Sequence, residues 1–224
     1  MRGWFVTATG TGVGKTFVTR GLATALRRRG HPVAAIKPVE TGCAPDPLDA
    51  RALARACGRP ELASAPGLYR APPPVAPYAA TLSGLPAPPP PDHLAATVRA
   101  LAPDTDITLV EGAGGLLVPL DRERTMADLA RALGLPLLLV ADDGLGVLSF
   151  TLTAADAARA RGLDVAAVVL VRREASPADP SRETNGRILA ERLAPVPVLQ
   201  FPHCADEDRA LADAAEAAGL LALV

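Results

Sequence analysis

The stretch TATGTGVGKT, residues 7–16, decides the fold because a glycine-rich turn here joins a short apolar strand to the start of a helix. Such glycines let successive backbone N–H groups point at one phosphate, and the helix N-terminus adds partial positive charge. Lys15 would reach the β- and γ-phosphates of a nucleotide, and the Thr16 hydroxyl would ligate Mg²⁺. Thr9 occupies the place of the first glycine in the strict GxxxxGK[ST] pattern. Strand, glycine turn, GKT and helix still follow in the required order, and an ordinary glycine turn would not explain the lysine.

Apolar runs alternate with helical stretches along the rest of the chain. The runs predict strands buried on both faces at residues 4–6, 33–36, 107–110, 135–141, 165–171 and 196–201. Helices are predicted between them at residues 15–29, 49–57, 92–101, 125–133, 151–161 and 181–193. This alternation predicts an α/β fold with a doubly wound, mostly parallel sheet and helices on both faces, in one phosphate-binding-loop (P-loop) domain over residues 1–224. The prolines of residues 71–91 predict a stiff extended loop within it.

Composition limits the partners that we expect. A net charge of −1 and a pI near 6.3 give no electrostatic reason to expect nucleic acid or an anionic membrane. The three cysteines form no CxxC pair, which suits a reducing compartment and predicts a cytoplasmic protein. The first ten residues lack the pattern of a signal peptide, and no apolar run reaches the roughly 18 residues of a membrane span. We therefore expect a small-molecule partner.

Lys15 and Lys37 are the only lysines among the 23 basic residues. The chain is rich in alanine, arginine, proline and glycine, a bias that would replace lysine by arginine wherever only a surface charge is needed. Two lysines that resist this bias indicate sites that require a compact ammonium, although survival by chance is the alternative. Lys37 ends the second predicted strand, which we expect beside the first, so its ammonium would face the phosphate-binding loop. A lysine that merely extends into solvent at a strand end is the other interpretation.

Two carboxylates are candidates for holding Mg²⁺ near the loop. Glu111 ends the run ITLVE and precedes glycines that allow a close backbone approach. Parallel sheets bind ligands at the carboxyl ends of their strands, and Mg²⁺ prefers carboxylate and phosphate oxygens. Asp49 opens the helical stretch DARALA, where it would be either the helix N-cap or a second carboxylate beside the metal. The residues alone favour the cap.

Four motifs together resemble the dethiobiotin synthase family of the biotin pathway. The hallmarks of that family are a GTDTxVGKT loop, a KPV/I-x-[ST]-G strand end, a DA pair that opens a helix, and VEGAGG. This chain has ATGTGVGKT, KPVETG, the pair Asp49 and Ala50, and VEGAGG in that order and at similar spacing. The resemblance implies ATP- and Mg²⁺-dependent closure of a ureido ring from 7,8-diaminononanoate and CO₂. The reaction would pass through a carbamate and a carbamic-phosphoric anhydride and release ADP and phosphate, in a homodimer.

The resemblance also implies roles for individual residues. In the catalytic centre, Lys37 would hold the carbamate, Lys15 would span the phosphates, and Thr11 would contact the substrate. The nucleotide-binding residues would be Gly12, Val13, Gly14, Lys15, Thr16, Phe17, Glu111, Gly112, Ala113, Gly114, Pro202 and His203. The substrate-binding residues would be Thr11, Lys37, Thr41, Leu145, Gly146 and Ser149, of which the last three would meet the substrate carboxylate near the dimer interface. Mg²⁺ would lie among Thr16, Asp49 and Glu111, which raises Asp49 from cap to metal ligand.

The chain departs from the family pattern at three places. Ala8 and Gly10 replace the glycine and aspartate of GTDT, and Gly10 removes a carboxylate beside the metal site. The asparagine that follows the strand 165–171 and reads adenine in the family is absent from VVLVRRE. Ser149 replaces another asparagine but keeps a hydroxyl donor at a helix N-terminus. Preference for ATP over other nucleoside triphosphates is therefore a hypothesis.

Other classes of protein share such a loop. A ParA- or MinD-like ATPase switch would carry an extra lysine early in the loop, where this chain has Thr9, Gly10 and Thr11. An amidoligase relative would normally add a glutaminase domain, for which 224 residues leave no room. A nucleotide-binding module without catalysis would not explain Lys37 and Glu111 together.

Overall fold

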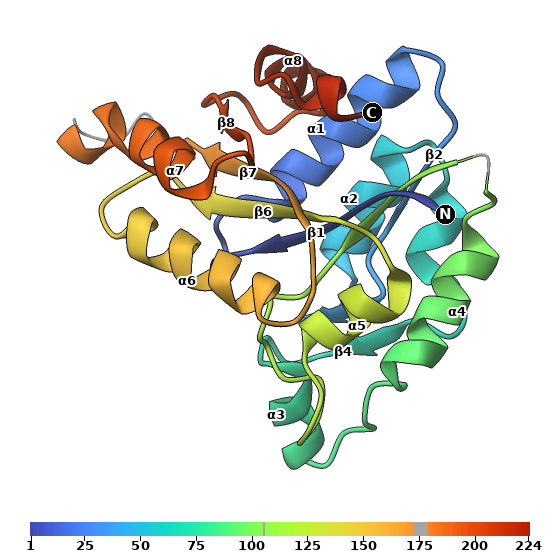
Figure 1. The fold of residues 1–224 in the computed structure, drawn as a ribbon. Helices are drawn as coiled ribbons and strands as arrows, with labels where there is room; N and C mark the ends of the chain where they lie inside the picture. Colours follow the sequence, from blue (N-terminus) through green and yellow to red (C-terminus); the bar gives the residue numbers. More distant parts are fainter. Residues whose placement is uncertain (105, 173–178) are drawn as a thin grey trace.

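A parallel six-stranded sheet forms the centre of the molecule (Figure 1). The computed structural model describes residues 1–104, 106–172 and 179–224. The strands of this sheet are β1 Arg2–Ala8, β2 Val33–Ile36, β5 Ile107–Glu111, β6 Leu137–Asp142, β7 Val165–Val171 and β8 Val198–Phe201. Their order is β2-β5-β1-β6-β7-β8, and every neighbouring pair is parallel. The predicted fold class is confirmed.

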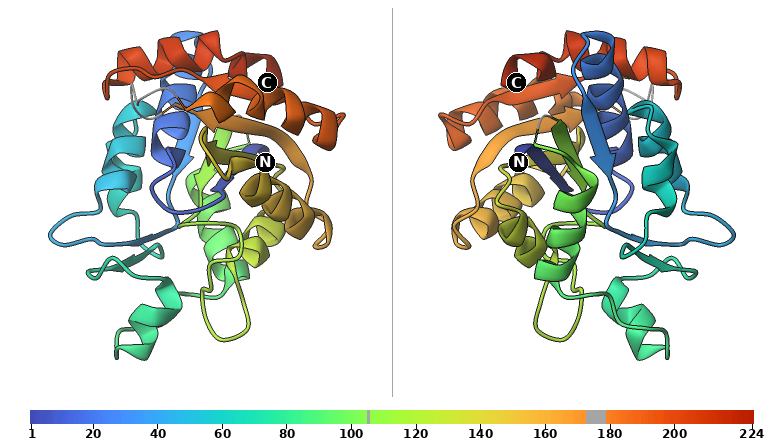
Figure 2. Two further views of the ribbon diagram at one scale, coloured as in Figure 1. Left: turned by 90° about the vertical axis from the view of Figure 1, so that its left-hand side faces the viewer. Right: turned by 90° about the vertical axis from the view of Figure 1, so that its right-hand side faces the viewer.

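Helices cover both faces of the sheet (Figure 2). The longer ones are α1 Lys15–Arg28, α2 Leu48–Ala56, α4 Pro91–Leu101, α5 Met126–Leu133, α6 Val147–Arg159, α7 Asn185–Leu193 and α8 Asp208–Ala217. α1 packs against both α2 and α8, whereas α4 packs against α5 and α6 against α7. The six predicted helices are present with shifted ends, and α8 is a helix that we did not predict. A short 3-10 helix, Pro180–Glu183, includes residue 181, where we predicted α7 to begin.

The order of the strands corrects one expectation about Lys37. We expected its strand, β2, beside β1, but β5 lies between them and pairs with both. β5 is buried along all five of its residues, so both of its edges need a neighbour to satisfy the backbone hydrogen bonds. The register aligns Ile36 with Val110, so the next residues along the two strands, Lys37 and Glu111, stand side by side. Lys37 therefore meets Glu111 directly.

The proline-rich segment is more structured than the sequence indicated. It contains α3, Pro77–Leu82, where we predicted an extended loop throughout residues 71–91. Proline fits the first position of a helix because that position needs no N–H donor, and α3 begins with Pro77. A second, two-stranded parallel sheet pairs β3, Val39–Thr41, with β4, Tyr69–Ala71. This small sheet directly follows Lys37 and Pro38 in the chain.

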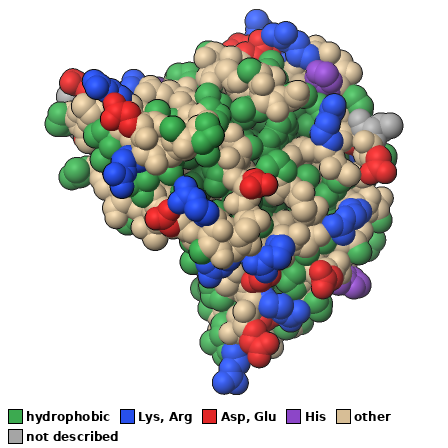
Figure 3. Space-filling model, viewed as in Figure 1, with side chains coloured by type: hydrophobic (Ala, Val, Ile, Leu, Met, Phe, Trp, Pro, Cys, Tyr) green, Lys and Arg blue, Asp and Glu red, His purple; other side chains and the backbone are tan. Residues whose placement is uncertain are grey.

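The surface carries charges of both signs. On the face shown in Figure 3, acidic and basic side chains are interspersed. Exposed ion pairs such as Arg159 with Asp156 and Arg187 with Glu191 likewise place opposite charges side by side on the surface. Among the described residues, no helix combines the length and the apolar character that a membrane span requires.

A close helix contact fixes α1 against α8. Gly21 lies in the middle of α1, and a methyl group added there would come within 2.4 Å of the backbone oxygen of Leu211 in α8. Only a hydrogen atom fits between the two backbones. Gly186, near the start of α7, instead faces the end of the flexible Gln200 side chain.

Gly21→Ala should lower the free energy of unfolding by about 1–3 kcal/mol, because the new methyl group forces α8 away from α1. Gly186→Ala is the matched control, and we expect it to change that free energy by less than about 1 kcal/mol. Urea denaturation of the two variants and the parent measures the difference. Equal stabilities for the two variants would contradict the close contact.

Candidate active site

The glycine-rich loop ends in a helix whose first turn is open to a ligand. Gly12 and Gly14 have φ angles of 72° and 102°, in the region where a side chain would be strained. Gly14 is the N-cap of α1 and leaves the helix without a side-chain cap, so the first N–H groups stay available for an anion. The local structure agrees with the phosphate-binding loop that the sequence predicted.

Lys15 is the first residue of α1 and is buried at the base of this loop. Its Nζ donates to the carbonyl oxygen of Gly10 at 3.1 Å. Burial lowers the pKa of Lys15 to about 8, although the nearby Glu111 carboxylate opposes the shift. A bound anion would replace solvent around this ammonium and favour its charged form.

Lys37 lies between two carboxylates. Its Nζ is 2.5 Å from Oδ2 of Asp49 and 2.6 Å from Oε1 of Glu111, and Glu111 also accepts a hydrogen bond from the Thr16 hydroxyl at 3.0 Å. Burial lowers the Lys37 pKa, but the charges of Glu111 and Asp49 outweigh burial and raise it above its ordinary value. Burial raises the Asp49 pKa, and the adjacent Lys37 ammonium more than reverses this, so the pKa of Asp49 is lowered. Lys37 is thus held as a cation at neutral pH, and the alternative of a lysine extending into solvent is wrong.

Asp49 is not the N-cap of α2. The cap position is Pro47, and the Asp49 carboxylate turns toward Lys37. The cap is supplied instead by Glu40 of β3, whose two carboxylate oxygens accept hydrogen bonds from the backbone N–H groups of Asp49 and Ala50, both at 2.9 Å. Sequence reasoning missed Glu40 because a cap that comes from another element leaves no local pattern.

A cleft of about 720 Å³ runs along this site. The predicted residues that line it are Thr11, Gly12, Gly14, Lys15, Thr16, Phe17, Lys37, Thr41, Asp49, Ala113 and Gly114. Glu111, which is fully buried, joins the site through Lys37 and Thr16, while Val13 and Gly112 do not line the cleft. The lining residues that were not predicted are Arg20, Glu40, Leu48, Ala52, Arg55, Pro74, Val75, Ala76, Pro77, Val118 and Asp206. Pro74 and Pro77 show that the proline-rich segment forms one wall of the cleft.

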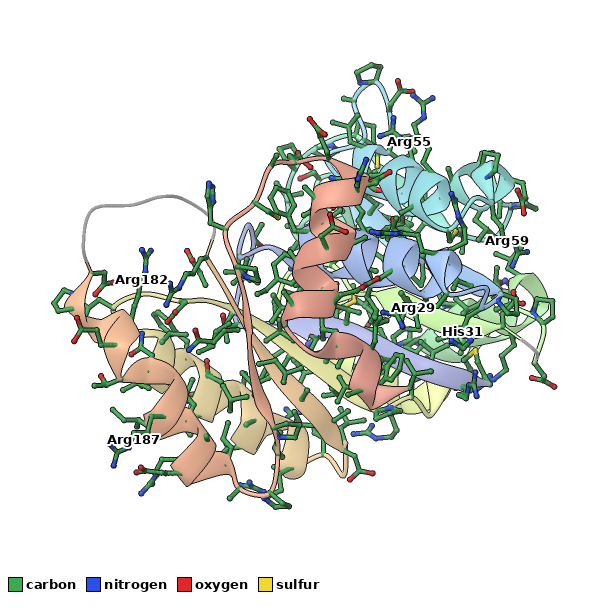
Figure 4. The ribbon with its side chains drawn as sticks, turned by 90° about the horizontal axis from the view of Figure 1, so that it is seen from above. Arg29, His31, Arg55, Arg59, Arg182 and Arg187 are labelled. Atoms are coloured by element: carbon green, nitrogen blue, oxygen red, sulfur yellow. The ribbon has the colours of Figure 1, made fainter. Side chains whose placement is uncertain are left out.

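The N-terminal part of α1 faces the cleft, whereas the residues that follow its C-terminal end do not. Arg55 of α2 lines the cleft, and Arg20 of α1 is held there by ion pairs with Asp206 and Asp208. Figure 4 labels Arg55 on α2, and it labels Arg29 and His31, which follow the C-terminal end of α1. The whole length of α1 separates Arg29 from Lys15. Neither Arg29 nor His31 lines the cleft.

Five further predicted residues, besides Val13, Glu111 and Gly112, do not line the cleft. Leu145, Gly146 and Ser149 stand at the N-terminus of α6 and are exposed, Leu145 by 88%. Pro202 and His203 follow β8 and are also exposed, although Asp206 of the same segment reaches the cleft. Of the stretch VVLVRRE, the last two residues lie outside the described part of the chain.

The fold and the loop define a P-loop nucleotide-binding protein. The cell division ATPase MinD of Pyrococcus furiosus matches with a TM-score of 0.56 and 20% identity over 99% of this chain and 100% of that one. Chloroplast FtsY of Physcomitrella patens matches with a TM-score of 0.53 and 20% identity over 96% of this chain, which spans 66% of the FtsY chain. At these identities the likeness concerns the fold alone.

Sequence comparison identifies the family. Residues 2–201 match a family model described as an AAA domain. ATP-dependent dethiobiotin synthetase BioD of Anaeromyxobacter sp. (strain Fw109-5) is 42% identical over 92% of each chain. The BioD proteins of Caulobacter vibrioides (strain NA1000 / CB15N) and Mycobacterium avium (strain 104) are 46% and 44% identical, over 76% and 85% of this chain and 80% and 83% of theirs. The chain belongs to the ATP-dependent dethiobiotin synthetase family and is an ATP-dependent ligase.

Lys37→Met should lower the free energy of unfolding by about 3 kcal/mol, because Glu111 would remain buried without its cation. Arg159→Met, which breaks the exposed pair with Asp156, should cause a much smaller change. Urea denaturation at pH 7 compares the two variants with the parent. Similar losses would show that the buried contact of Lys37 carries no special weight.

Proposed function

We propose that this chain closes the ureido ring of dethiobiotin, joining 7,8-diaminononanoate and CO₂ while ATP is converted to ADP and phosphate. The observation that carries the proposal is the Lys37 ammonium, held between Asp49 and Glu111 in the same cleft as Lys15 and the glycine-rich loop. Family membership supports the substrates, because the curated relatives carry the name dethiobiotin synthetase.

The charges of the cleft suit phosphoryl transfer to a carbamate. One substrate amine adds to CO₂ and gives a carbamate, whose oxygen attacks the γ-phosphorus of ATP as ADP leaves. The second amine then attacks the carbonyl carbon of the mixed anhydride, phosphate departs, and the amine protons pass to solvent or phosphate. Such transfer depends mainly on positioning and charge stabilisation. In the proposal, Lys15 and the loop N–H groups hold the phosphates, Lys37 holds the carbamate oxygen, and Thr11 and Thr41 orient the substrate.

The oxygen donors at the site fit Mg²⁺. Oε2 of Glu111 is buried and has no hydrogen-bond partner among the described residues, so one carboxylate lone pair is open to a cation. Asp49 and the Thr16 hydroxyl lie next to it. In the part of the chain that the structure describes, no three or more His, Cys, Asp or Glu side chains are grouped so that they could hold a metal ion by themselves. One or two carboxylates with phosphate oxygens are the usual environment of Mg²⁺. Thr16, Asp49 and Glu111 would hold the ion, which would neutralise phosphate charge, and the loss of the family aspartate at Gly10 still leaves two carboxylates.

The proposal also assigns roles to predicted residues outside the cleft, at a dimer interface and beside the nucleotide base. Leu145 and Phe150, at the start of α6, expose 88% and 62% of their surface, as expected of apolar side chains that a second subunit covers. In a homodimer, Leu145, Gly146 and Ser149 would then approach the substrate carboxylate of the partner. Pro202 and His203 would border the nucleotide base, because Asp206 of the same segment lines the cleft. The chain would act as one domain, in the cytoplasm, with small-molecule substrates.

Lys37→Arg tests the function most directly. With ATP, Mg²⁺ and bicarbonate, the parent should release phosphate and form a ureido product only when the diamine is present. The arginine variant should still bind nucleotide but lose about 10²- to 10³-fold in kcat, because charge stabilisation at the transferred group is misplaced. Phosphate release and mass spectrometry of the product are the measurements, with Arg159→Lys as the surface control. Diamine-independent release, or full activity of Lys37→Arg, would overturn the proposal.

Asp49→Asn tests the metal site. The Mg²⁺ concentration for half-maximal activity should rise on the order of 10- to 100-fold, because a charged oxygen ligand is lost. Asp46→Asn alters a carboxylate just before α2 that pairs with Arg51 instead, and it should leave the Mg²⁺ dependence unchanged. Equal Mg²⁺ dependence in both variants would remove Asp49 from the metal site.

A further inference from the structure

Glu40 and Arg70 occupy paired positions in the small sheet beside the cleft. The parallel register of β3 and β4 aligns Glu40 with Arg70. β3 follows Lys37 after a single proline, so this pair lies close to the lysine along the chain. Glu40 occupies only the variable position of the motif KPVETG, no motif includes Arg70, and the proposed mechanism uses neither residue.

Glu40 fixes the start of α2. Glu40 is only 5% exposed, and its carboxylate accepts hydrogen bonds from the backbone N–H groups of Asp49 and Ala50, both at 2.9 Å. Pro47 caps α2 without any side-chain hydrogen bond, so the carboxylate from β3 takes over the role of the cap. A negative charge at a helix N-terminus also meets the positive end of the helix dipole. The backbone that carries Asp49 is thereby tied to β3.

Arg70 fixes the backbone of Lys37. Its Nη1 donates to the carbonyl oxygens of Lys37 at 2.9 Å and Tyr69 at 2.8 Å, and its Nη2 donates to the carbonyl oxygen of Ala63 at 3.3 Å. The guanidinium thus joins β4, the end of β2 and the segment before β4. Arg70 does not line the cleft of about 720 Å³, so its effect on a ligand there is indirect, and its bond to the Lys37 carbonyl joins it to a residue that does line the cleft.

We propose that Glu40 and Arg70 are a positioning pair that sets the contact between Asp49 and Lys37, Glu40 through the backbone of Asp49 and Arg70 through the backbone of Lys37. The pair therefore places both the ammonium and one carboxylate before any ligand arrives. The catalytic consequence rests on the proposed function, whereas the effect on Lys37 does not.

The two lysines of this chain make the proposal directly measurable. Protein labelled with ¹³C- and ¹⁵N-lysine gives side-chain NMR signals from Lys15 and Lys37 alone. The signal that disappears in Lys37→Arg belongs to Lys37, and the signal that remains belongs to Lys15. In Glu40→Gln one acceptor becomes a donor that faces a backbone N–H, and in Arg70→Met the bond to the Lys37 carbonyl is lost. In both variants the Lys37 side-chain signal of the ligand-free protein should shift and broaden, whereas in Asp46→Asn it should stay in place.

Kinetics provide the second readout. Glu40→Gln and Arg70→Met should lower kcat on the order of 10- to 100-fold with little change in the KM for ATP. Without the supporting contact, Lys37 or Asp49 moves away from the position that the reacting groups require. Glu40→Asp, which keeps the carboxylate, should recover part of the loss. Thermal melting identifies any variant that does not fold. If Glu40→Gln does not fold, Glu40→Asp and Arg70→Met test the positioning role.

An unchanged Lys37 signal in folded Glu40→Gln and Arg70→Met, or an equal shift in Asp46→Asn, would overturn the positioning pair. If the parent protein formed no ureido product, the proposed function would fail while the NMR comparison still decided the role of the pair.

Discussion

The contact of Lys37 with Glu111 and Asp49 is the constraint on which the site depends. Glu111 is fully buried, and a carboxylate without a cation or hydrogen-bond donors is very unfavourable there. Lys37 and Thr16 meet this requirement at 2.6 and 3.0 Å. Such a buried pair adds little net stability, because the loss of hydration offsets the attraction between the charges. Its effect is geometric, since it sets the distance between cation and carboxylates before a ligand binds.

The strand order supplies this geometry. β2, β5 and β1 are consecutive in the sheet, and their carboxyl ends carry Lys37, Glu111 and the glycine-rich loop. Placing β5 in the middle puts the carboxylate between the lysine of one neighbour and the loop of the other, where it contacts both Lys37 and Thr16. With β1 beside β2, as the sequence suggested, Glu111 would have stood at the edge of this group. The correction to the topology therefore explains why one carboxylate serves both sides of the site.

The sequence indicated those parts of the site that local patterns encode. Glycines before GKT predicted the loop, and an acidic residue after a buried strand predicted Glu111, because both depend on neighbours in the chain. Pairing between strands depends on the packing of the whole sheet, so the place of β5 was not evident. The cap of α2 by Glu40 joins residues nine and ten positions apart across two elements, and a local search assigned that role to Asp49 instead. α8, whose alanine-rich face packs on α1, begins without a side-chain cap, and Gly219, which follows its C-cap with a φ of 78°, is a stop signal that we did not use in predicting helices.

The geometry also shows why a chain that replaces most lysines by arginine keeps Lys37. Two carboxylate oxygens from different elements lie 2.5 and 2.6 Å from one nitrogen atom. An ammonium has three N–H donors on that single atom, so two can serve Asp49 and Glu111 while the third remains for the cleft that Lys37 lines. A guanidinium spreads its donors over a rigid planar fork, so it reaches two carboxylates only through different nitrogen atoms, as Arg20 does with Asp206 and Asp208. Arginine could keep the charge at this position, but it could not direct donors from one atom at two separate carboxylates and a ligand.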